Sequence, residues 1–402
     1  MMMMTMTAVR RSAAQSAAKS EEDCLMSETV EPIEDGPFSF KPIISPLENK
    51  LMWMLFAIPI AVYFEFSEQH AYAFFASMAA IMPLAWLMGK GTEEIAFRTS
   101  ESLGGLLNAT FGNAVELIIG ALALYAAYSN PDLTENMITV VQATLIGSIL
   151  GNLLLVLGLS FLWGGLKYKK QKFNAQVSQT NGSLLLLALI GLVIPAAFAA
   201  ANKGVSNDSI VSLSRWTALV LLAIYCLNML FQLKTHATLY ATDGHHDEEA
   251  ELSQKQAIIL LLGATLFVAW MAHILVASIE YAAEEFSIPH LFIGVILLPL
   301  FGNAAEHMTA VTVARKDKMD LSISIAVGSS IQIALLVAPF MVLFGWAMGV
   351  GMSLQFGLFE TVTCLVSVLI TNFIIQDGES NWFEGVMLLA TYLIIAMAFL
   401  YM

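Results

Sequence analysis

The chain has 402 residues, of which 58% are hydrophobic and only 12% are charged, and its net charge at pH 7 is −14. Soluble globular proteins carry about 25% charged residues, so this composition excludes an ordinary soluble protein and indicates a polytopic membrane protein. The sequence has no basic stripe, which argues against nucleic acid as a partner. Its three cysteines are widely spaced and imply neither a disulfide framework nor a thiolate metal cluster.

Residues 1–50 differ from the rest of the chain. They are rich in Ser, Ala and Glu and contain no apolar run as long as the core of a signal peptide. We therefore expect a disordered cytosolic tail. Arg10 and Arg11 precede a Ser/Ala stretch, as in a transit peptide, whereas Glu21–Asp23 argue against one, so a targeting role is the alternative.

Apolar runs of about 16 to 28 residues recur between Leu51 and the C-terminus, and we count eleven of them. Most are long enough to cross a hydrocarbon core of about 30 Å as helices. The sequence therefore predicts an all-α polytopic membrane protein with about eleven transmembrane helices. The runs are 51–66, 71–88, 104–127, 137–163, 183–201, 215–233, 257–279, 291–313, 322–349, 353–375 and 383–402.

The positions of Lys and Arg predict how these helices are oriented. With the N-terminus placed in the cytosol, 16 of the 18 basic residues fall on the cytosolic side, in the tail and after every second run. Only Lys203 and Arg215 fall on the opposite side. Because a wrong number of spans would scramble this pattern, the pattern supports the count of eleven.

A hexamer occurs twice, as Phe111–Glu116 and Phe301–Glu306, with five of six positions identical. Gly147–Leu150 and Gly328–Ile331 correspond in the runs that follow. Each hexamer lies in the second helix of a five-helix block, and five is odd, so the blocks form inverted repeats with a site at the membrane midplane. The predicted parts are the tail 1–50, an extra helix 51–68, a first repeat 69–233, an acidic cytosolic linker 234–256 and a second repeat 257–402.

Glu116 and Glu306 end the two hexamers and lie near the middle of their apolar runs. A charged residue at the centre of a bilayer costs about 2.5–3.5 kcal/mol on insertion scales, so such a residue usually serves a function. Since the two glutamates hold the same position in two repeats, we predict that they share one site. The alternative is that both are protonated and stabilise helix packing through hydrogen bonds.

The residues next to the glutamates suit a hard cation. Asn113 and Asn303 share a helix face with the glutamates that follow them at i+3. Gly112 and Gly302 each lower helix propensity by about 1 kcal/mol relative to Ala, and a break there would free backbone carbonyls. Ca²⁺ prefers carboxylate, amide and carbonyl oxygens, about 6–8 of them. Two glutamates balance one Ca²⁺ or bind protons instead, so the predicted transported ions are Ca²⁺ and H⁺, with no cofactor.

Further polar residues are candidates for a supporting role. For Ser148, Ser329 and Ser330, function and simple helix packing are equally good interpretations. Gln332 is an amide deep in an apolar run, which favours function, and His307 either tunes selectivity or proton access or packs as a neutral side chain. The charged segment after the sixth run is a solvated linker or a cation sensor. Its candidate regulatory residues are Asp247, Glu248, Glu249 and Glu251.

Over about residues 50–402 the chain resembles the cation/proton exchanger family of the calcium/cation antiporter superfamily. Its motifs are Gly112–Ile118, Gly302–His307 with its continuation Ala314–Leu321, and Gly328–Ala334. The resemblance implies one extra helix and two inverted five-helix repeats joined by an acidic segment. It also implies location in a vacuolar or other acidic-organelle membrane, as for many members.

The resemblance also implies roles for individual residues. Two departures from the family pattern, Val115 where many members have Thr and Gly151 where many have Ser, bear on cation preference rather than on class. The implied roles are ligands for Glu116 and Glu306, carbonyl donors for Gly112 and Gly302, site amides for Asn113 and Asn303, and the glutamine of the second motif for Gln332.

The sequence thus predicts a secondary transporter that exchanges cytosolic Ca²⁺ for protons by alternating access. The alternatives are a Mn²⁺/H⁺ exchanger, a Na⁺/Ca²⁺ exchanger and, less favoured, a cation channel. An enzyme is disfavoured because the sequence has no His-Glu-x-x-His, no Gly-x-Ser-x-Gly and no pair of intramembrane aspartates. The expected surroundings are the lipid bilayer, and the oligomeric state is left open.

Overall fold

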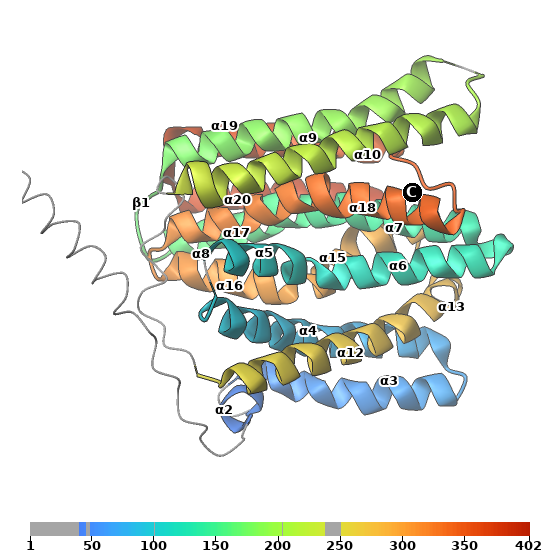
Figure 1. The fold of residues 1–402 in the computed structure, drawn as a ribbon, viewed down its shortest axis with the longest axis horizontal. Coiled ribbons are helices and arrows are strands. Elements are labelled where there is room, and N and C mark those ends of the chain that lie inside the picture. The colour runs from blue at the N-terminus through green and yellow to red at the C-terminus, as the bar shows by residue number, and fades with distance from the viewer. Residues whose placement is uncertain (1–39, 46–48, 100, 203, 238–250) are drawn as a thin grey trace, which may run out of the picture. The chain divides into compact units, whose positions relative to one another are not determined.

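The computed structural model of the protein describes residues 40–45, 49–99, 101–202, 204–237 and 251–402. In this part of the chain, long helices lie side by side (Figure 1). Eight stretches are long and apolar enough to cross a membrane, and two bent helix pairs bring the number to ten. The uninterrupted helices among them are α4 (His70–Ala96), α9 (Ala175–Ala201), α12 (Gln254–Ala277) and α20 (Trp382–Leu400).

The other spans contain a change of helix type or a break. Short α2 (Lys41–Ile44) and α13 (Ile279–Phe286) lie outside them. Three spans combine α-helices with wider π turns. The first consists of the 3₁₀ turn η2 (Pro131–Leu133), α7 (Thr134–Leu150), the π turn η3 (Gly151–Val156) and α8 (Leu157–Gly165). The second consists of α10 (Asn207–Leu230) and the π turn η4 (Phe231–Thr235), and the third of α17 (Met319–Gln332), the π turn η6 (Ile333–Val337) and α18 (Ala338–Met348). The last is α19 (Leu358–Ile374) with η7 (Ile375–Asp377). The bent pairs are α5 (Glu101–Gly112) with α6 (Ala114–Ser129), and α14 (His290–Phe292), η5 (Ile293–Leu297) and α15 (Leu298–Gly302) with α16 (Ala304–Arg315).

The all-α membrane fold agrees with the sequence-based prediction, but the count of eleven spans is not confirmed. The first predicted run, 51–66, forms a 3₁₀ helix, η1 (Lys50–Phe56), and a ten-residue α-helix, α3 (Ala57–Phe66). A 3₁₀ helix rises about 2.0 Å per residue and an α-helix 1.5 Å, so together they extend about 29 Å. The segment therefore nearly matches the bilayer core in length although it has fewer residues than an α-helical span.

Several helices extend beyond the apolar runs that predicted them. Helices α9 and α10 each begin eight residues before their runs at 183 and 215. Each is capped by a polar side chain, because Asn174 and Ser206 accept hydrogen bonds from backbone N–H groups of the first turn. Lys90, predicted to lie in a loop, is likewise part of α4. Hydropathy marks the apolar core of a helix and misses its polar, capped ends.

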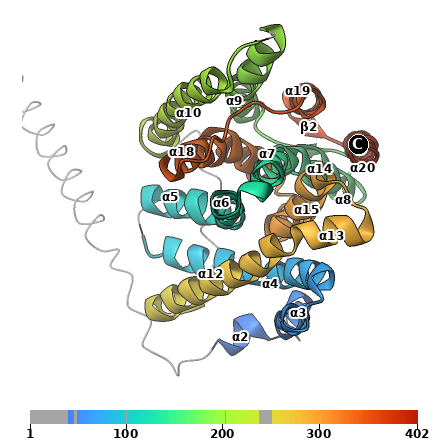
Figure 2. The same cartoon turned by 90° about the vertical axis from the view of Figure 1, so that its right-hand side faces the viewer.

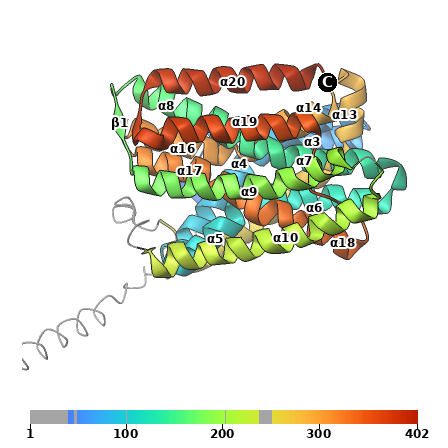
Figure 3. The same ribbon diagram turned by 90° about the horizontal axis from the view of Figure 1, so that it is seen from above.

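The helix α7–η3–α8 is the most enclosed of the spans. In its most apolar window 83% of the residues are buried, against 28% for α9 and for α20. Viewed along the helices, α7 lies in the middle of the bundle (Figure 2). The helices α20, α19, α9 and α10 lie next to one another on one face (Figure 3). A helix that is apolar on all sides and enclosed by others can carry polar groups for the interior of the bundle.

Basic loops gather at one end of the bundle. The short strands β1 (Gln171–Lys172) and β2 (Glu379–Ser380) pair antiparallel there. Beside them Lys170 and Glu379 form an exposed ion pair, whose hydrogen bond raises the pKa of the lysine and lowers the pKa of the glutamate. Lys167 donates a hydrogen bond to the carbonyl of Arg315 at 3.2 Å, so the loop after α16 lies at this end as well.

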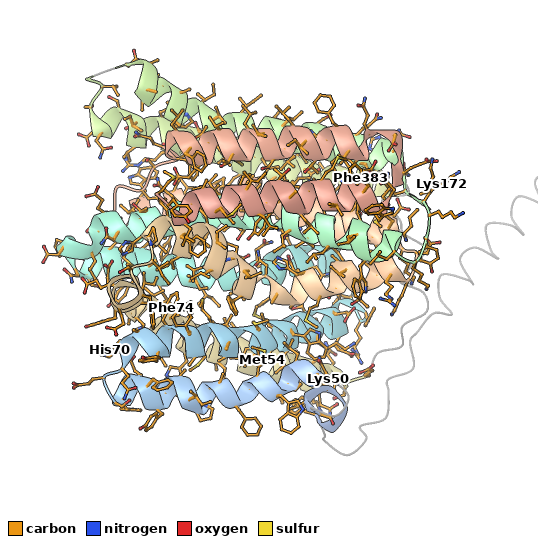
Figure 4. All side chains as sticks on the ribbon, turned by 180° about the vertical axis from the view of Figure 1, so that it is seen from behind. Lys50, Met54, His70, Phe74, Lys172 and Phe383 are labelled. Atoms are coloured by element: carbon orange, nitrogen blue, oxygen red, sulfur yellow. The ribbon has the colours of Figure 1, made fainter. Side chains whose placement is uncertain are left out.

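The same end also holds the C-terminus of α4, where Arg98 donates a hydrogen bond to the carbonyl of Leu252. Figure 4 places Lys50 and Lys172 at this end and His70 at the other. Loops that the sequence assigns to one membrane side therefore lie together in space.

We predict that the loops 167–172 and 315–318 are accessible from one side of the membrane and the loop 129–136 from the other. Single cysteines are introduced into each loop of a variant that lacks Cys24, Cys226 and Cys364. They are then labelled with an impermeant thiol reagent in sealed vesicles of known orientation. Labelling of loops 129–136 and 167–172 from the same side would contradict the topology.

Candidate cation site

The two glutamate motifs form two helix breaks. The helix axis bends by 47° between α5 and α6 and by 59° between α15 and α16. The bends occur at Asn113 (φ −103°, ψ 16°) and Asn303 (φ −97°, ψ 10°), one residue after the glycines that predicted a break. At each break the backbone leaves the α-helical conformation at the asparagine and re-enters it at the next residue, so the two copies of the motif share one local geometry.

Each break presents the start of one helix and the end of another. Glu116 and Glu306 lie in the first turns of α6 and α16. The positive end of a helix dipole favours a carboxylate in that position. The helices α5 and α15 end at Gly112 and Gly302, and the last carbonyls of a helix lack partners within it. One break therefore places a carboxylate at the start of one helix and beside the carbonyl end of another.

The two motifs face each other across the bundle. A Cβ atom added to Gly112 would lie 3.0 Å from the Oε1 atom of Glu306, so this carboxylate rests on the opposite break. Glu116 lies against the amide of Asn303 and the hydroxyl of Ser148. Each glutamate thus contacts the break of the other motif, and the two belong to one cluster in which Glu116 is buried and Glu306 is partly buried.

Helices α7 and α17 add polar side chains to this cluster. The hydroxyl of Ser329 lies against Glu306 and accepts a hydrogen bond of 3.0 Å from the Nδ2 atom of Asn152. The Nδ2 atom of Asn113 donates to the Oε1 atom of Gln332 at 2.6 Å. Asn152 is one of the polar groups that the sequence places in these apolar runs, and the structure adds its contact with Ser329.

Several buried polar atoms in the cluster have no hydrogen-bond partner of ordinary geometry among the described residues. They are the Oε2 atom of Glu116, the hydroxyl of Ser148 and the Nδ2 atom of Asn303. A buried polar group without a partner costs about 1–3 kcal/mol. Helix packing alone would not favour such an arrangement, whereas a site that exchanges ions needs groups available to them.

The remaining predicted residues lie outside the contacts that form the cluster. The hydroxyl of Ser330 donates to the carbonyl of Ala326 in its own helix at 3.0 Å, which is the packing alternative. His307 is buried in the turn after Glu306. Glu251 is exposed, and its backbone N–H donates to Glu94 at 3.1 Å. Asp247, Glu248 and Glu249 fall outside the described residues, so the regulatory role of this segment stays a prediction.

In the described part of the chain, no group of three or more His, Cys, Asp or Glu side chains is arranged so that it could hold a metal ion. The candidate site consists of two carboxylates with amide, hydroxyl and carbonyl oxygens around them. Such a set of oxygens suits a hard cation of the Ca²⁺ class. It offers a cation two full negative charges, and the same carboxylates can accept protons.

A family model described as sodium/calcium exchanger protein matches residues 70–234 and 256–401, which include both glutamate motifs. The chain is 46% identical over 344 residues to a Ca²⁺/H⁺ antiporter of Aphanothece halophytica, covering 82% of this chain and 90% of that protein. It is 42% identical over 366 residues to vacuolar cation/proton exchanger 2 of Oryza sativa subsp. japonica, covering 88% of this chain and 82% of that protein.

Among solved structures, the chain is similar to the selenium-substituted Ca²⁺/H⁺ antiporter protein YfkE. The TM-score is 0.73 at 39% sequence identity, over 87% of this chain and 98% of that one. The similarity in fold therefore extends over nearly the whole of that antiporter, and the predicted family resemblance is confirmed.

The wall of the site depends on a close helix crossing. A Cβ atom at Gly147 would lie 2.2 Å from the backbone carbonyl oxygen of Val295 in η5. We predict that Gly147→Ala lowers the free energy of unfolding by about 1–3 kcal/mol, because backbone cannot move away as a side chain can. Thermal unfolding of the purified protein measures the change. Gly89→Ala is the matched control, since nothing lies within 4 Å of that Cβ, and an equal loss in both would contradict the prediction.

Proposed function

The chain belongs to the sodium/calcium exchanger protein family, and from this premise we propose that it exchanges Ca²⁺ for protons across a membrane. The observation that carries the proposal is the pair of glutamates, Glu116 buried and Glu306 partly buried, each lying against the opposite helix break. The names of the relatives agree with it, because they include Ca²⁺/H⁺ antiporters and a cation/proton exchanger. The chain is thus proposed to be a transporter rather than an enzyme.

In the proposed loaded state, the two carboxylates balance the charge of one Ca²⁺. The amide oxygens of the two asparagines, carbonyls near Gly112 and Gly302 and the hydroxyls of Ser148 and Ser329 are the candidate further ligands. Ca²⁺ accepts about 6–8 oxygens in flexible geometry, which suits a site assembled from several helices. Gln332 holds the amide of Asn113 and so orients it.

Protons and Ca²⁺ are proposed to compete for the same carboxylates. A carboxylate must lose its proton to bind a metal, so filling the site with Ca²⁺ releases protons. With neither ligand bound, two like charges remain in a closed apolar interior, which is unfavourable. This penalty would prevent the empty site from switching sides. The two fluxes would then be coupled, because only a bound ligand with different affinities for the two conformations can shift the equilibrium between them.

The orientation proposed here places the basic loops and the N-terminus in the cytosol, following the tendency of Lys and Arg to stay on that side. Relatives named a vacuolar cation/proton exchanger and a vacuolar calcium ion transporter support a vacuolar or other acidic-organelle membrane. In such a membrane the proton gradient would drive Ca²⁺ out of the cytosol.

Two related cargoes give alternative functions. Mn²⁺ accepts similar oxygen ligands, and the family description itself names sodium. Several Na⁺ ions would need additional carboxylates, whereas the described cluster contains two. Uptake into proteoliposomes with Ca²⁺, Mn²⁺ and Na⁺ as separate cargoes distinguishes these functions, and Na⁺-driven uptake that needs no pH gradient would overturn proton coupling.

We predict that Glu116→Gln and Glu306→Gln each abolish exchange in proteoliposomes, because glutamine neither carries a charge nor binds the proton. Each should weaken Ca²⁺ binding about 10- to 100-fold, the effect of losing one charged hydrogen-bonding partner or ligand. Glu360→Gln is the matched control, since Glu360 is a buried carboxylate at the start of α19 whose side chain lies against Gly357. Wild-type exchange by either variant of the motif glutamates would refute the shared site.

We further predict that the apparent affinity for Ca²⁺ falls as the pH on the loading side falls. If both carboxylates exchange a proton for Ca²⁺, the logarithm of the Kd changes with pH with a limiting slope of about two. Isothermal titration of the detergent-purified protein at a series of pH values measures the slope. A Kd that is independent of pH would contradict competition between the two ions.

A further inference from the structure

A small cavity adjoins Glu116 on the side away from the basic loops. It lies between α6, α7 and α18, and its lining includes Gly120, Thr144 and Met341. The space available to the centre of a water molecule is about 10 Å³, enough for one water. Because α6 runs from the break at Asn113 to Ser129, this cavity lies on the way from the carboxylate to the end that carries the α6–α7 loop.

The cavity is lined by two polar residues, Glu116 and Thr144, and otherwise by apolar residues. The Oε2 atom of Glu116 is buried and has no hydrogen-bond partner of ordinary geometry among the described residues. The hydroxyl of Thr144 donates to the carbonyl of Val140 at 2.8 Å, which leaves its oxygen free to accept a further bond. A water in this position would have two polar partners, the minimum for a stable buried water. Ca²⁺ with its shell of about 6–8 oxygens would not fit.

One contact closes the bundle beside this cavity. A Cβ atom at Gly120 would lie 2.8 Å from the Sδ atom and 3.1 Å from the Cε atom of Met341, so the thioether is seated where glycine lacks a side chain. One turn further along both helices, Gly345 faces Leu124, with 3.8 Å from its added Cβ to the Cδ1 atom. Helices α6 and α18 thus run side by side toward the same end, and the contact joins the helix of Glu116 to the continuation of the helix that carries Ser329.

We propose that Met341, packed on Gly120, is the constriction that closes the site toward the α6–α7 end while one water remains at Glu116. This inference rests on the proposed exchange function. Methionine has three rotatable bonds beyond its backbone and adapts to irregular space. Rotation of the thioether away from Gly120 widens the passage without moving backbone, whereas the seated thioether closes it.

The first test measures access directly and does not depend on exchange. Val141 lines the cavity, and Val141→Cys in a variant without Cys24, Cys226 and Cys364 serves as reporter. Adding Met341→Ala should raise its rate of modification by an impermeant thiol reagent, applied from the α6–α7 side, by about tenfold or more. Val268→Cys, equally buried in α12, is the control and should not respond. An unchanged rate at Val141→Cys, or an equal rise at Val268→Cys, would overturn the proposal.

The second test uses the missing Cβ. Gly120→Ala forces the thioether out of its seat, so it should raise the modification rate of Val141→Cys as Met341→Ala does, and the double variant should be no faster than Met341→Ala alone. Gly263→Ala is the matched control, because nothing lies within 4 Å of its Cβ. Additive effects of the two changes would show that they act at separate places and would refute a shared constriction. Failure of Ca²⁺/H⁺ exchange in the wild type, by contrast, would refute the proposed function and leave the labelling result standing.

Discussion

The placement of two carboxylates, one buried and one partly buried, inside an apolar helix bundle is the constraint on which the other features of the structure depend. A charged group at the bilayer centre is unfavourable by several kcal/mol unless it has partners. Here the partners come from two helix starts, from the amide of Asn303 and from the hydroxyls of Ser148 and Ser329. Because Glu116, Ser148 and Asn303 each keep a buried atom without a hydrogen-bond partner of ordinary geometry among the described residues, this compensation is only partial.

The broken and widened helices follow from the same constraint. A continuous helix satisfies its own backbone and offers a cation nothing, whereas a break exposes carbonyls and concentrates helix dipoles at one point. The π turn η3 follows Ser148 in the span α7–η3–α8, and the π turn η6 follows Ser329 at the corresponding place in the span α17–η6–α18. Such turns are rare and occur frequently at functional sites, since they shift the side chains that follow by part of a turn.

Close packing around the cluster limits what can reach it. The missing Cβ atoms of Gly147 and Gly294 let α7 and η5 approach until backbone meets backbone or a small side chain. The thioether of Met341 fills the space over Gly120 in the same way, but with an atom that can rotate aside. The backbone contacts at Gly147 and Gly294 are rigid and hold the helices around the site together. The side-chain contact between Met341 and Gly120 is movable, and it is the part that can open.

The sequence by itself determined the class of the protein, the order of its long helices, the two glutamates and the position of each helix break to within one residue, because hydrophobicity and glycine act locally along the chain. It did not determine that 51–66 is part 3₁₀ helix, nor where α9 and α10 begin, since capping involves polar residues that hydropathy ignores. Only the tertiary structure decided that Glu306 rests on Gly112, that Asn152 joins the cluster and that Ser330 does not. These outcomes depend on how helices far apart in the sequence rotate against one another, and close packing fixes that rotation only when all of the helices are in place.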